Sequence, residues 1–257
     1  MSSDVSDPQM QLLIDLHKHN ERQGPGGREE TELAMYLAGV DFHAPMKVAD
    51  IGCGTGASSL ILADHLNAHI TCVDFLQDFL DELKQRAHAA EVSEKITTLC
   101  CSMDALPFDP DSLDMIWSEG AIYNIGFEAG IRNCTGFLKE SGLLVASEIT
   151  WTRDERPAEL QQYWEQAYPE IDTASVKIAQ LEKNGYQVLG YFILPKECWL
   201  ENYYHPIANN ADAFIAEHDG SESAHQIIAS EREEISLYEK YSDYYSYGVY
   251  IARKVGK

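Results

Sequence analysis

The chain has 257 residues, with 42 Asp plus Glu against 19 Lys plus Arg, and a formal net charge of −23. Such an acidic surface repels phosphate polymers and anionic leaflets, which argues against nucleic-acid and membrane binding. Apolar residues make up 45% without a run long enough to span a membrane. These properties predict a globular protein whose partner is a small neutral or cationic molecule.

The cysteine pattern predicts neither disulfides nor a metal site. The six cysteines form no C-x-x-C pair, and no histidine stands at metal-ligand spacing from them. The vicinal pair Cys100 and Cys101 falls in a predicted buried strand, which favours packing over thiophilic chemistry. The N-terminus lacks the basic and apolar regions of a signal peptide, so we expect a cytoplasmic location.

Short apolar runs alternate with amphipathic stretches through the middle of the chain. The expected strands are 47–51, 68–73, 96–101, 113–117 and 143–149, and the expected helices are 57–66, 75–91 and 127–139. This alternation predicts an α/β fold with a doubly wound, mostly parallel sheet. Ligands of such sheets bind at the carboxyl ends of the strands.

The flanking segments predict two attachments to this core. The expected elements are helices 8–21 and 28–39, helix 173–184, strand 186–194, a helical stretch 206–240 and strand 247–253. We therefore expect an N-terminal helical cap over residues 1–45 and a main domain over 46–257. Its long connection, about 196–243, is expected to cover the substrate side.

The strongest local pattern is the segment Val48–Gly56, in which a strand leads into three alternate glycines and then a helix. Glycines permit a sharp turn and close approach to a ligand, and a helix start offers free N–H groups. The spacing differs from the G-x-G-x-x-G of dinucleotide sites, which argues against a nicotinamide-dependent oxidoreductase. Asp50, before the first glycine, suits a ligand ammonium group better than a pyrophosphate.

Acidic residues also follow the next two strands. Asp74 stands 22 residues after Gly52, where a carboxylate commonly binds both ribose hydroxyls; capping helix 75–91 is the alternative, and the two roles can coexist. After the third strand, Met103 could offer an apolar surface to an adenine ring, and Asp104 an acceptor to its amine.

Taken together, these patterns resemble the class I S-adenosylmethionine-dependent methyltransferases, particularly small bacterial ones of the methyltransferase-domain 11/25, UbiE-like type. The resemblance covers residues 45–150 and rests on Val48–Gly56, Asp74, Asp104–Phe108 and Gly142–Glu148. It implies a Rossmann-like, seven-stranded sheet whose last strand is antiparallel. It also implies that the segment His19–Gly26 folds over the cofactor S-adenosylmethionine.

The resemblance implies a role for each motif. The glycines line the methionine part, Asp74 the ribose, and the residues after the third strand, with Phe75, the adenine. The backbone after the fourth strand borders the sulfonium. Together with Asp50, the residues assigned to the cofactor are Gly52, Gly54, Gly56, Asp74, Phe75, Met103, Asp104, Ser118 and Glu119.

Methyl transfer from a sulfonium depends on alignment and water exclusion, and it requires a base only if the acceptor must lose a proton. The catalytic candidates are Glu119 and Tyr123, which follow the fourth strand. Glu119 could orient a cationic substrate or accept a proton; alternatively it caps the next helix or binds local backbone N–H groups. Members of the family that it resembles often carry His or another polar residue near this position, so Glu119 is a departure that leaves the identity of a base open.

Trp151, Tyr204 and His205 are the candidates for the substrate side. Each has an ordinary alternative, as a packed loop aromatic or a structural histidine. The tyrosines between 238 and 250 could form a cage for a methylated ammonium, although tyrosine is also common in strands and interfaces. Residues 201–243 hold ten acidic residues against Arg232 and Lys240, which favours neutral or cationic acceptors.

The sequence therefore predicts an S-adenosylmethionine-dependent methyltransferase with a small-molecule substrate, and a homodimer is a candidate assembly. Two alternatives remain open. One is a cofactor-binding protein of the same fold without turnover, and the other is a methyltransferase that acts on a protein.

Overall fold

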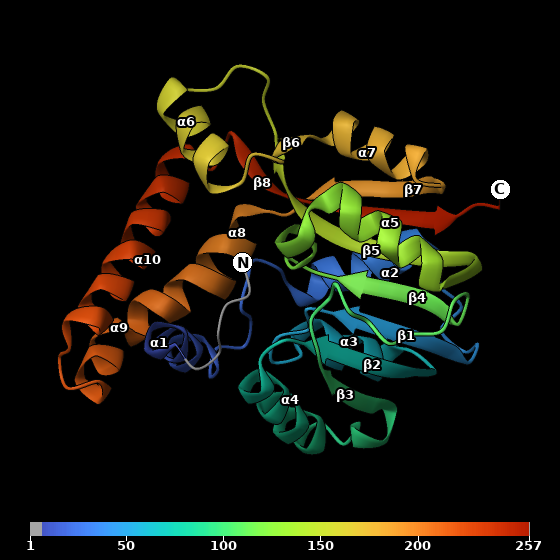
Figure 1. Ribbon diagram of the computed structural model, residues 1–257, viewed down its shortest axis with the longest axis horizontal. Coiled ribbons are helices and arrows are strands. Elements are labelled where there is room, and N and C mark those ends of the chain that lie inside the picture. Colours follow the sequence, from blue (N-terminus) through green and yellow to red (C-terminus); the bar gives the residue numbers. More distant parts are fainter. Residues whose placement is uncertain (1–6, 257) are drawn as a thin grey trace.

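The structure is a computed structural model that describes residues 7–256. Within them the chain forms an eight-stranded sheet in the order β3-β2-β1-β4-β5-β8-β7, with β6 paired to β5 (Figure 1). The strands are β1 Met46–Ile51, β2 Ala68–Asp74, β3 Ile96–Cys100, β4 Leu113–Ser118, β5 Leu138–Trp151, β6 Asp172–Thr173, β7 Tyr186–Ile193 and β8 Tyr245–Lys254. Strands β1 to β6 pair in parallel, whereas β8 runs antiparallel to β5 and β7. This arrangement confirms the predicted Rossmann-like fold.

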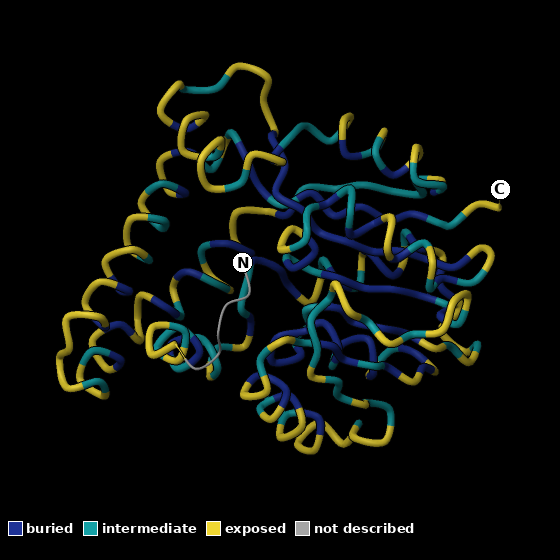
Figure 2. The backbone as a smooth tube through the Cα atoms, viewed as in Figure 1, coloured by how far each residue is buried: buried dark blue, intermediate teal, exposed yellow. Residues whose placement is uncertain are grey.

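Helices cover both faces of the sheet, as its buried apolar strands require. Helices α2, α3 and α4 pack on one face, and α5 and α7 on the other (Figures 1 and 2). The helices are α1 Pro8–His17, α2 Arg28–Ala38, α3 Ala57–His65, α4 Gln77–Ala89, α5 Phe127–Phe137, α6 Ala158–Ala167, α7 Ala174–Lys183, α8 Lys196–Trp199, α9 His205–Glu217 and α10 Glu222–Tyr241. Short helical turns η1 Ser93–Lys95, η2 Ile122–Ile125 and η3 Leu200–Tyr204 connect them.

A separate lobe stands beside the sheet, at the left of Figure 1. Helices α1, α9 and α10 pack there around a small apolar core that includes Leu16, Ile207, Phe214 and Ile228. A second, aromatic core joins this lobe to the ends of β5 and β8. The lobe brings the first and last parts of the chain together, because α1 packs against both α9 and α10.

Several predicted boundaries differ from the structure for local reasons. Helix α4 begins at Gln77 because Asp74 Oδ1 already accepts the backbone N–H of Leu76. The stretch 206–240 is two helices, since the chain turns at Gly220 with φ of 63°. Strand β5 extends to Trp151 because it pairs with β8 as far as that residue.

Three further differences concern the ends of the chain and the edge of the sheet. Helix α1 ends at His17 rather than at residue 21, and α6 was not predicted. The expected burial of Cys100 and Cys101 is wrong: Cys100 is exposed and Cys101 half-buried, because β3 is the edge strand of the sheet. Residues 1–6 of the predicted cap lie outside the described residues.

Candidate functional site

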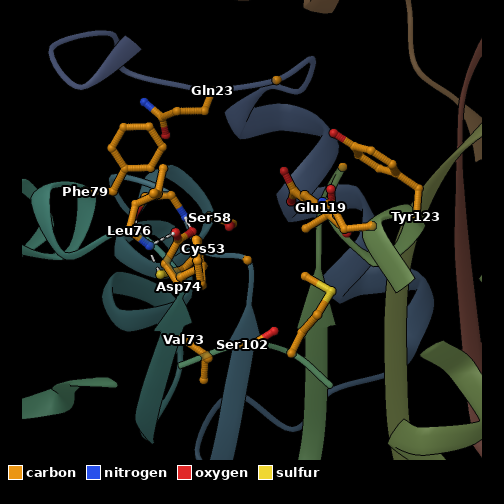
Figure 3. A pocket seen from close by; sticks show the side chains of 18 of the residues that line it. Gln23, Cys53, Ser58, Val73, Asp74, Leu76, Phe79, Ser102, Glu119 and Tyr123 are labelled. Atoms are coloured by element: carbon orange, nitrogen blue, oxygen red, sulfur yellow. Dashed lines mark hydrogen bonds between the residues drawn. The ribbon is translucent and has the colours of Figure 1, made fainter. Parts of the chain in front are cut away.

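A cavity of about 720 Å³ opens at the carboxyl ends of the parallel strands. Its walls come from the segments that follow β1, β2, β3 and β4, and from the N-terminal segment 22–25. Figure 3 shows Asp74 and Phe79 on one side of this cavity and Glu119 with Tyr123 on the other. The motifs that the sequence placed after separate strands therefore meet at one site, as expected for a doubly wound sheet.

The glycine turn forms the floor of the cavity. Gly52, Gly54 and Gly56 all have positive φ, at 73°, 55° and 91°. A Cβ on Gly54 would collide with Gln23 Oε1, so this position needs glycine both for its conformation and for space. Gly52 and Gly54 line the cavity, whereas Gly56 packs against Leu83 and lies outside it.

Asp74 lies at the rim, with both carboxylate oxygens oriented by backbone groups. Oδ2 accepts the N–H of Gly54 at 2.9 Å and Oδ1 that of Leu76 at 2.9 Å. Burial raises the pKa of Asp74, and these two hydrogen bonds oppose that rise. A carboxylate has about four acceptor positions, so after these two bonds Asp74 can still accept hydrogen bonds from a ligand.

Apolar side chains flank Asp74. Phe75 is 41% exposed and lines the cavity with Met103 and Asp104, as the sequence predicts. Phe79 of α4 adds a second ring to the same wall. The sequence analysis assigned Phe79 only to the apolar face of a helix, because its periodicity fits that role equally well.

Asp50 lies on the expected strand, but its carboxylate does not line the cavity. It is fully buried, and its Oδ2 accepts hydrogen bonds from the hydroxyls of Ser58 (2.9 Å) and Ser59 (2.6 Å). Burial raises its pKa to about 7. Ser58 lines the cavity and Asp50 does not, so Asp50 is placed to orient Ser58 rather than to touch a ligand.

Glu119 faces the cavity with most of its acceptor positions already engaged. Its Oε2 binds Arg22 Nη1 at 2.8 Å. Its Oε1 accepts hydrogen bonds from Thr31 Oγ1 (3.0 Å) and Trp117 Nε1 (2.9 Å). Three donors on one carboxylate argue against the predicted role of Glu119 as a base. All three donors are side chains, whereas the predicted alternative was that Glu119 binds local backbone N–H groups. Glu119 instead anchors the N-terminal segment.

That segment, residues 19–26, is held on both sides of the cavity. Gln23 Oε1 accepts the backbone N–H of Thr55 at 2.9 Å, next to the glycine turn. Asn202 Nδ2 donates to the carbonyl of Gly26 at 2.7 Å. The sequence placed this segment over the cofactor but did not single out Arg22 or Gln23, whose partners at the cavity, Glu119 and Thr55, are 97 and 32 residues away.

Two further candidates follow β4. Tyr123 lines the cavity, is 40% exposed and packs edge-on against Tyr168. Desolvation raises its pKa, and the charges of Glu234 and Glu148 raise it further, so its hydroxyl stays protonated at neutral pH. Ser118 lies below the cavity, where its hydroxyl donates to the carbonyl of Ile51 at 2.8 Å.

None of the three predicted substrate residues lines the cavity. Trp151 continues β5 into the aromatic core, with its ring edge-on to Tyr245 at 6.3 Å. Tyr204 is 1% exposed and donates to Glu234 Oε1 at 2.9 Å. His205 is exposed at the start of α9. These places follow from the structure, in which β5 is longer than predicted and η3 runs directly into α9.

No helix within residues 7–256 is long and apolar enough to cross a membrane. No three His, Cys, Asp or Glu side chains in that range gather so that they could hold a metal ion.

Comparisons with known proteins agree with this geometry. Residues 48–142 match the family model described as a methyltransferase domain. An uncharacterized methyltransferase of Bacillus subtilis, YodH, is 28% identical over 138 residues, which are 54% of this chain and 57% of that protein. The chain spans about half the length of the curated relatives that it matches.

Solved structures share the fold over nearly the whole chain. A methyltransferase from Geobacter sulfurreducens, in complex with S-adenosyl-L-homocysteine, has a TM-score of 0.83 at 16% identity and covers 95% of this chain and 98% of its own. The cyclase SpnF has a TM-score of 0.76 at 19% identity, over 96% of this chain and 93% of its own. Residues 48–142 therefore match a methyltransferase domain, and the described chain shares its fold with S-adenosylmethionine-dependent methyltransferases of known structure.

Proposed function

We propose that this chain binds S-adenosylmethionine in the cavity and transfers its methyl group to a small neutral or cationic molecule. The observation that carries the proposal is the meeting of the glycine turn, the oriented carboxylate of Asp74 and the wall around Met103 in one cavity. When bound, the cofactor supplies an activated methyl group on its sulfonium.

The residues present fit that cofactor. Asp74 keeps acceptor positions for two ribose hydroxyls, and Phe75, Phe79 and Met103 offer apolar surface to a base. The Ser58 hydroxyl and the backbone of the glycine turn provide polar contacts for an amino-acid group. Arg22 is not free to bind a phosphate, since its guanidinium is engaged with Glu119 and Thr31.

The chain's own contribution to the reaction is positioning and exclusion of water. The N-terminal segment crosses the cavity and is tied to the glycine turn through Gln23 and to the end of β4 through Arg22. This arrangement supports alignment of two bound molecules, which can supply most of the acceleration in a displacement reaction. We assign residues 1–45 to a cap because of these two contacts. We assign residues of about 196–243 to the substrate-side cover because Asn202 binds the carbonyl of Gly26.

The likeness to SpnF favours a second candidate. That protein is a cyclase on the same fold, so the fold alone does not specify methyl transfer. Binding of the cofactor without transfer is therefore the rival function, and the test must measure binding and transfer separately.

The test begins with calorimetric titration of S-adenosylhomocysteine and NADH into the purified chain. We expect the first to bind and the second not to bind. Incubation with methyl-labelled S-adenosylmethionine and separate pools of amines, phenols, thiols and carboxylates should then label at least one pool. Binding without label in any pool would support the rival function, and no binding at millimolar ligand would refute the proposal.

A further inference from the structure

An aromatic and acidic cluster lies directly behind one wall of the cavity. Gly120 lines the cavity, and a Cβ at this position would lie 3.0 Å from the ring of Tyr247. Tyr247 packs against Trp199 with ring centroids 5.0 Å apart, and Trp199 packs against Tyr204 at 5.9 Å. A continuous series of rings therefore leads from the cavity wall into the lobe.

This series ends at a carboxylate. Glu234 of α10 accepts the hydroxyl of Tyr204 on Oε1 at 2.9 Å and is half-buried. Desolvation raises the pKa of Tyr123, Tyr203 and Tyr247, and the negative charge of Glu234 raises the pKa of each further. Tyr123 is itself a cavity residue. Burial also raises the pKa of Glu234. Glu234 is thus a desolvated carboxylate that binds the last ring of the series leading from the cavity wall.

A second carboxylate lies on the same face of α10, three residues earlier. Glu231 Oε1 is 3.7 Å from His17 Nε2, and the His17 ring stacks on Tyr203 at 6.3 Å. Glu231 Oε2 is buried and has no hydrogen-bond partner among residues 7–256. A buried acceptor without a donor costs free energy, so this unpaired oxygen needs an explanation.

An organic cation would satisfy these groups together. Carboxylates supply the opposite charge and accept N–H bonds, and the faces of tyrosine and tryptophan attract ammonium groups through their quadrupoles. An anionic acceptor would be repelled by the two glutamates, and a neutral acceptor would leave their charge unbalanced. We propose that Glu234, with Glu231 and the surrounding tyrosines, selects a methyl acceptor that carries an organic ammonium group; this rests on the proposed function.

The experiment compares two ligands of the same shape and different charge, choline and 3,3-dimethylbutan-1-ol. Each is titrated by calorimetry into the full chain saturated with S-adenosylhomocysteine. We expect choline to bind about tenfold more tightly than the neutral alcohol, in line with a carboxylate and cation–π contribution of about 1.4 kcal/mol. The Glu234→Gln variant, which keeps an acceptor for Tyr204, should reduce this preference to less than about threefold.

The matched control is Glu233→Gln, which removes the same charge from the adjacent, exposed position of α10. It should keep the full preference for choline, and both variants should melt like the parent. Equal affinity for the two ligands, no binding of choline, or an unchanged preference in Glu234→Gln would overturn the inference. If S-adenosylhomocysteine does not bind, the proposed function fails. Titrating choline and 3,3-dimethylbutan-1-ol into the chain without S-adenosylhomocysteine still tests whether the ammonium site exists.

Discussion

The two sides of the cavity are built in different ways. The side around Asp74 consists of strand ends and tight turns, and its polar contacts use backbone groups such as the N–H of Gly54 and Leu76. The side around Tyr123 depends on side chains from distant parts of the chain, such as Arg22 and Tyr168, and the proposed ammonium site behind it uses Glu234 of the lobe. Backbone groups hold one ligand in a fixed geometry, whereas side chains on a lobe can differ without disturbing the sheet.

This difference has a consequence for specificity. A contact made by a strand end changes only if the fold changes, so the first side suits a ligand shared by many proteins of one fold. The lobe packs around its own apolar core, and its carboxylates can be replaced at little cost to the sheet. We therefore expect substitutions on the first side to affect cofactor binding, and substitutions on the second to affect the acceptor.

The largest expected effect comes from Asp74→Asn. The variant replaces a charged acceptor with an amide, and hydrogen bonds to charged groups contribute about 1.5–3 kcal/mol each, so S-adenosylhomocysteine should bind about a hundredfold more weakly. Calorimetry measures this directly. The control is Asp78→Asn, an exposed acid in the first turn of α4. Similar affinities in the two variants would remove Asp74 from the cofactor site.

Arg22→Met should have the next largest effect. It leaves Glu119 without its ion-pair partner at a site where the Arg22 side chain is 8% exposed, so we expect S-adenosylhomocysteine affinity to fall about tenfold and the protein to lose stability. The double variant Arg22→Met/Glu119→Gln removes the unpaired charge and should recover part of the stability. Arg28→Met, at an exposed ion pair with Glu32, should change neither quantity. No loss of affinity would show that the segment does not hold the ligand.

The pH dependence of stability tests whether burying the carboxylate of Asp50 beneath the glycine turn lowers the free energy of unfolding. Its folded pKa of about 7 lies above the ordinary value of 3.8, because burial outweighs the bonds from Ser59 and Ser58. The folded state therefore binds this proton more tightly than the unfolded chain does. The resulting stabilisation is complete below about pH 4 and is lost as the pH rises through about 7.

The Asp50→Asn variant should abolish this contribution. The parent loses stability as the pH rises and the variant does not. The melting temperature of the variant minus that of the parent should therefore increase by about 5 °C from about pH 5 to 8, since about 1 kcal/mol shifts the melting temperature by 2–4 °C in a protein of this size. Calorimetric scans at several pH values measure the difference. A difference that stays constant across this range would contradict the raised pKa.

Tyr123→Phe should have the smallest effect. The ring stays, and the hydroxyl cannot act as a base at neutral pH because its raised pKa keeps it protonated, so we expect kcat to change by less than about threefold. Removing a true catalytic base typically lowers kcat by about a hundredfold or more, which makes the two roles distinguishable. Initial rates with the acceptor pool that becomes labelled measure kcat for the variant and the parent.

Much of the fold and of the first side of the cavity could be predicted from the sequence. The segment Val48–Gly56, Asp74 and Met103 lie within about 55 residues, and each follows a strand whose apolar character is local. The carboxyl ends of parallel strands must meet at one edge of the sheet, so a local pattern was enough to bring these residues together. Gly52, Gly54, Asp74, Phe75, Met103 and Asp104 accordingly line the cavity.

The remaining features depend on contacts that span the chain. Asp50 has the expected strand position, but the hydroxyls of α3 turn its carboxylate away from the cavity. Glu119 is engaged by Arg22, 97 residues earlier, which no local pattern reveals.

The sequence by itself determined the sheet, the turn and the acidic character of the insert, because periodicity, glycine spacing and charge are local or additive properties. Only the tertiary structure decided which insert residues contact one another. Tyr204 and Glu234 are 30 residues apart and meet only because α9 and α10 fold back on each other.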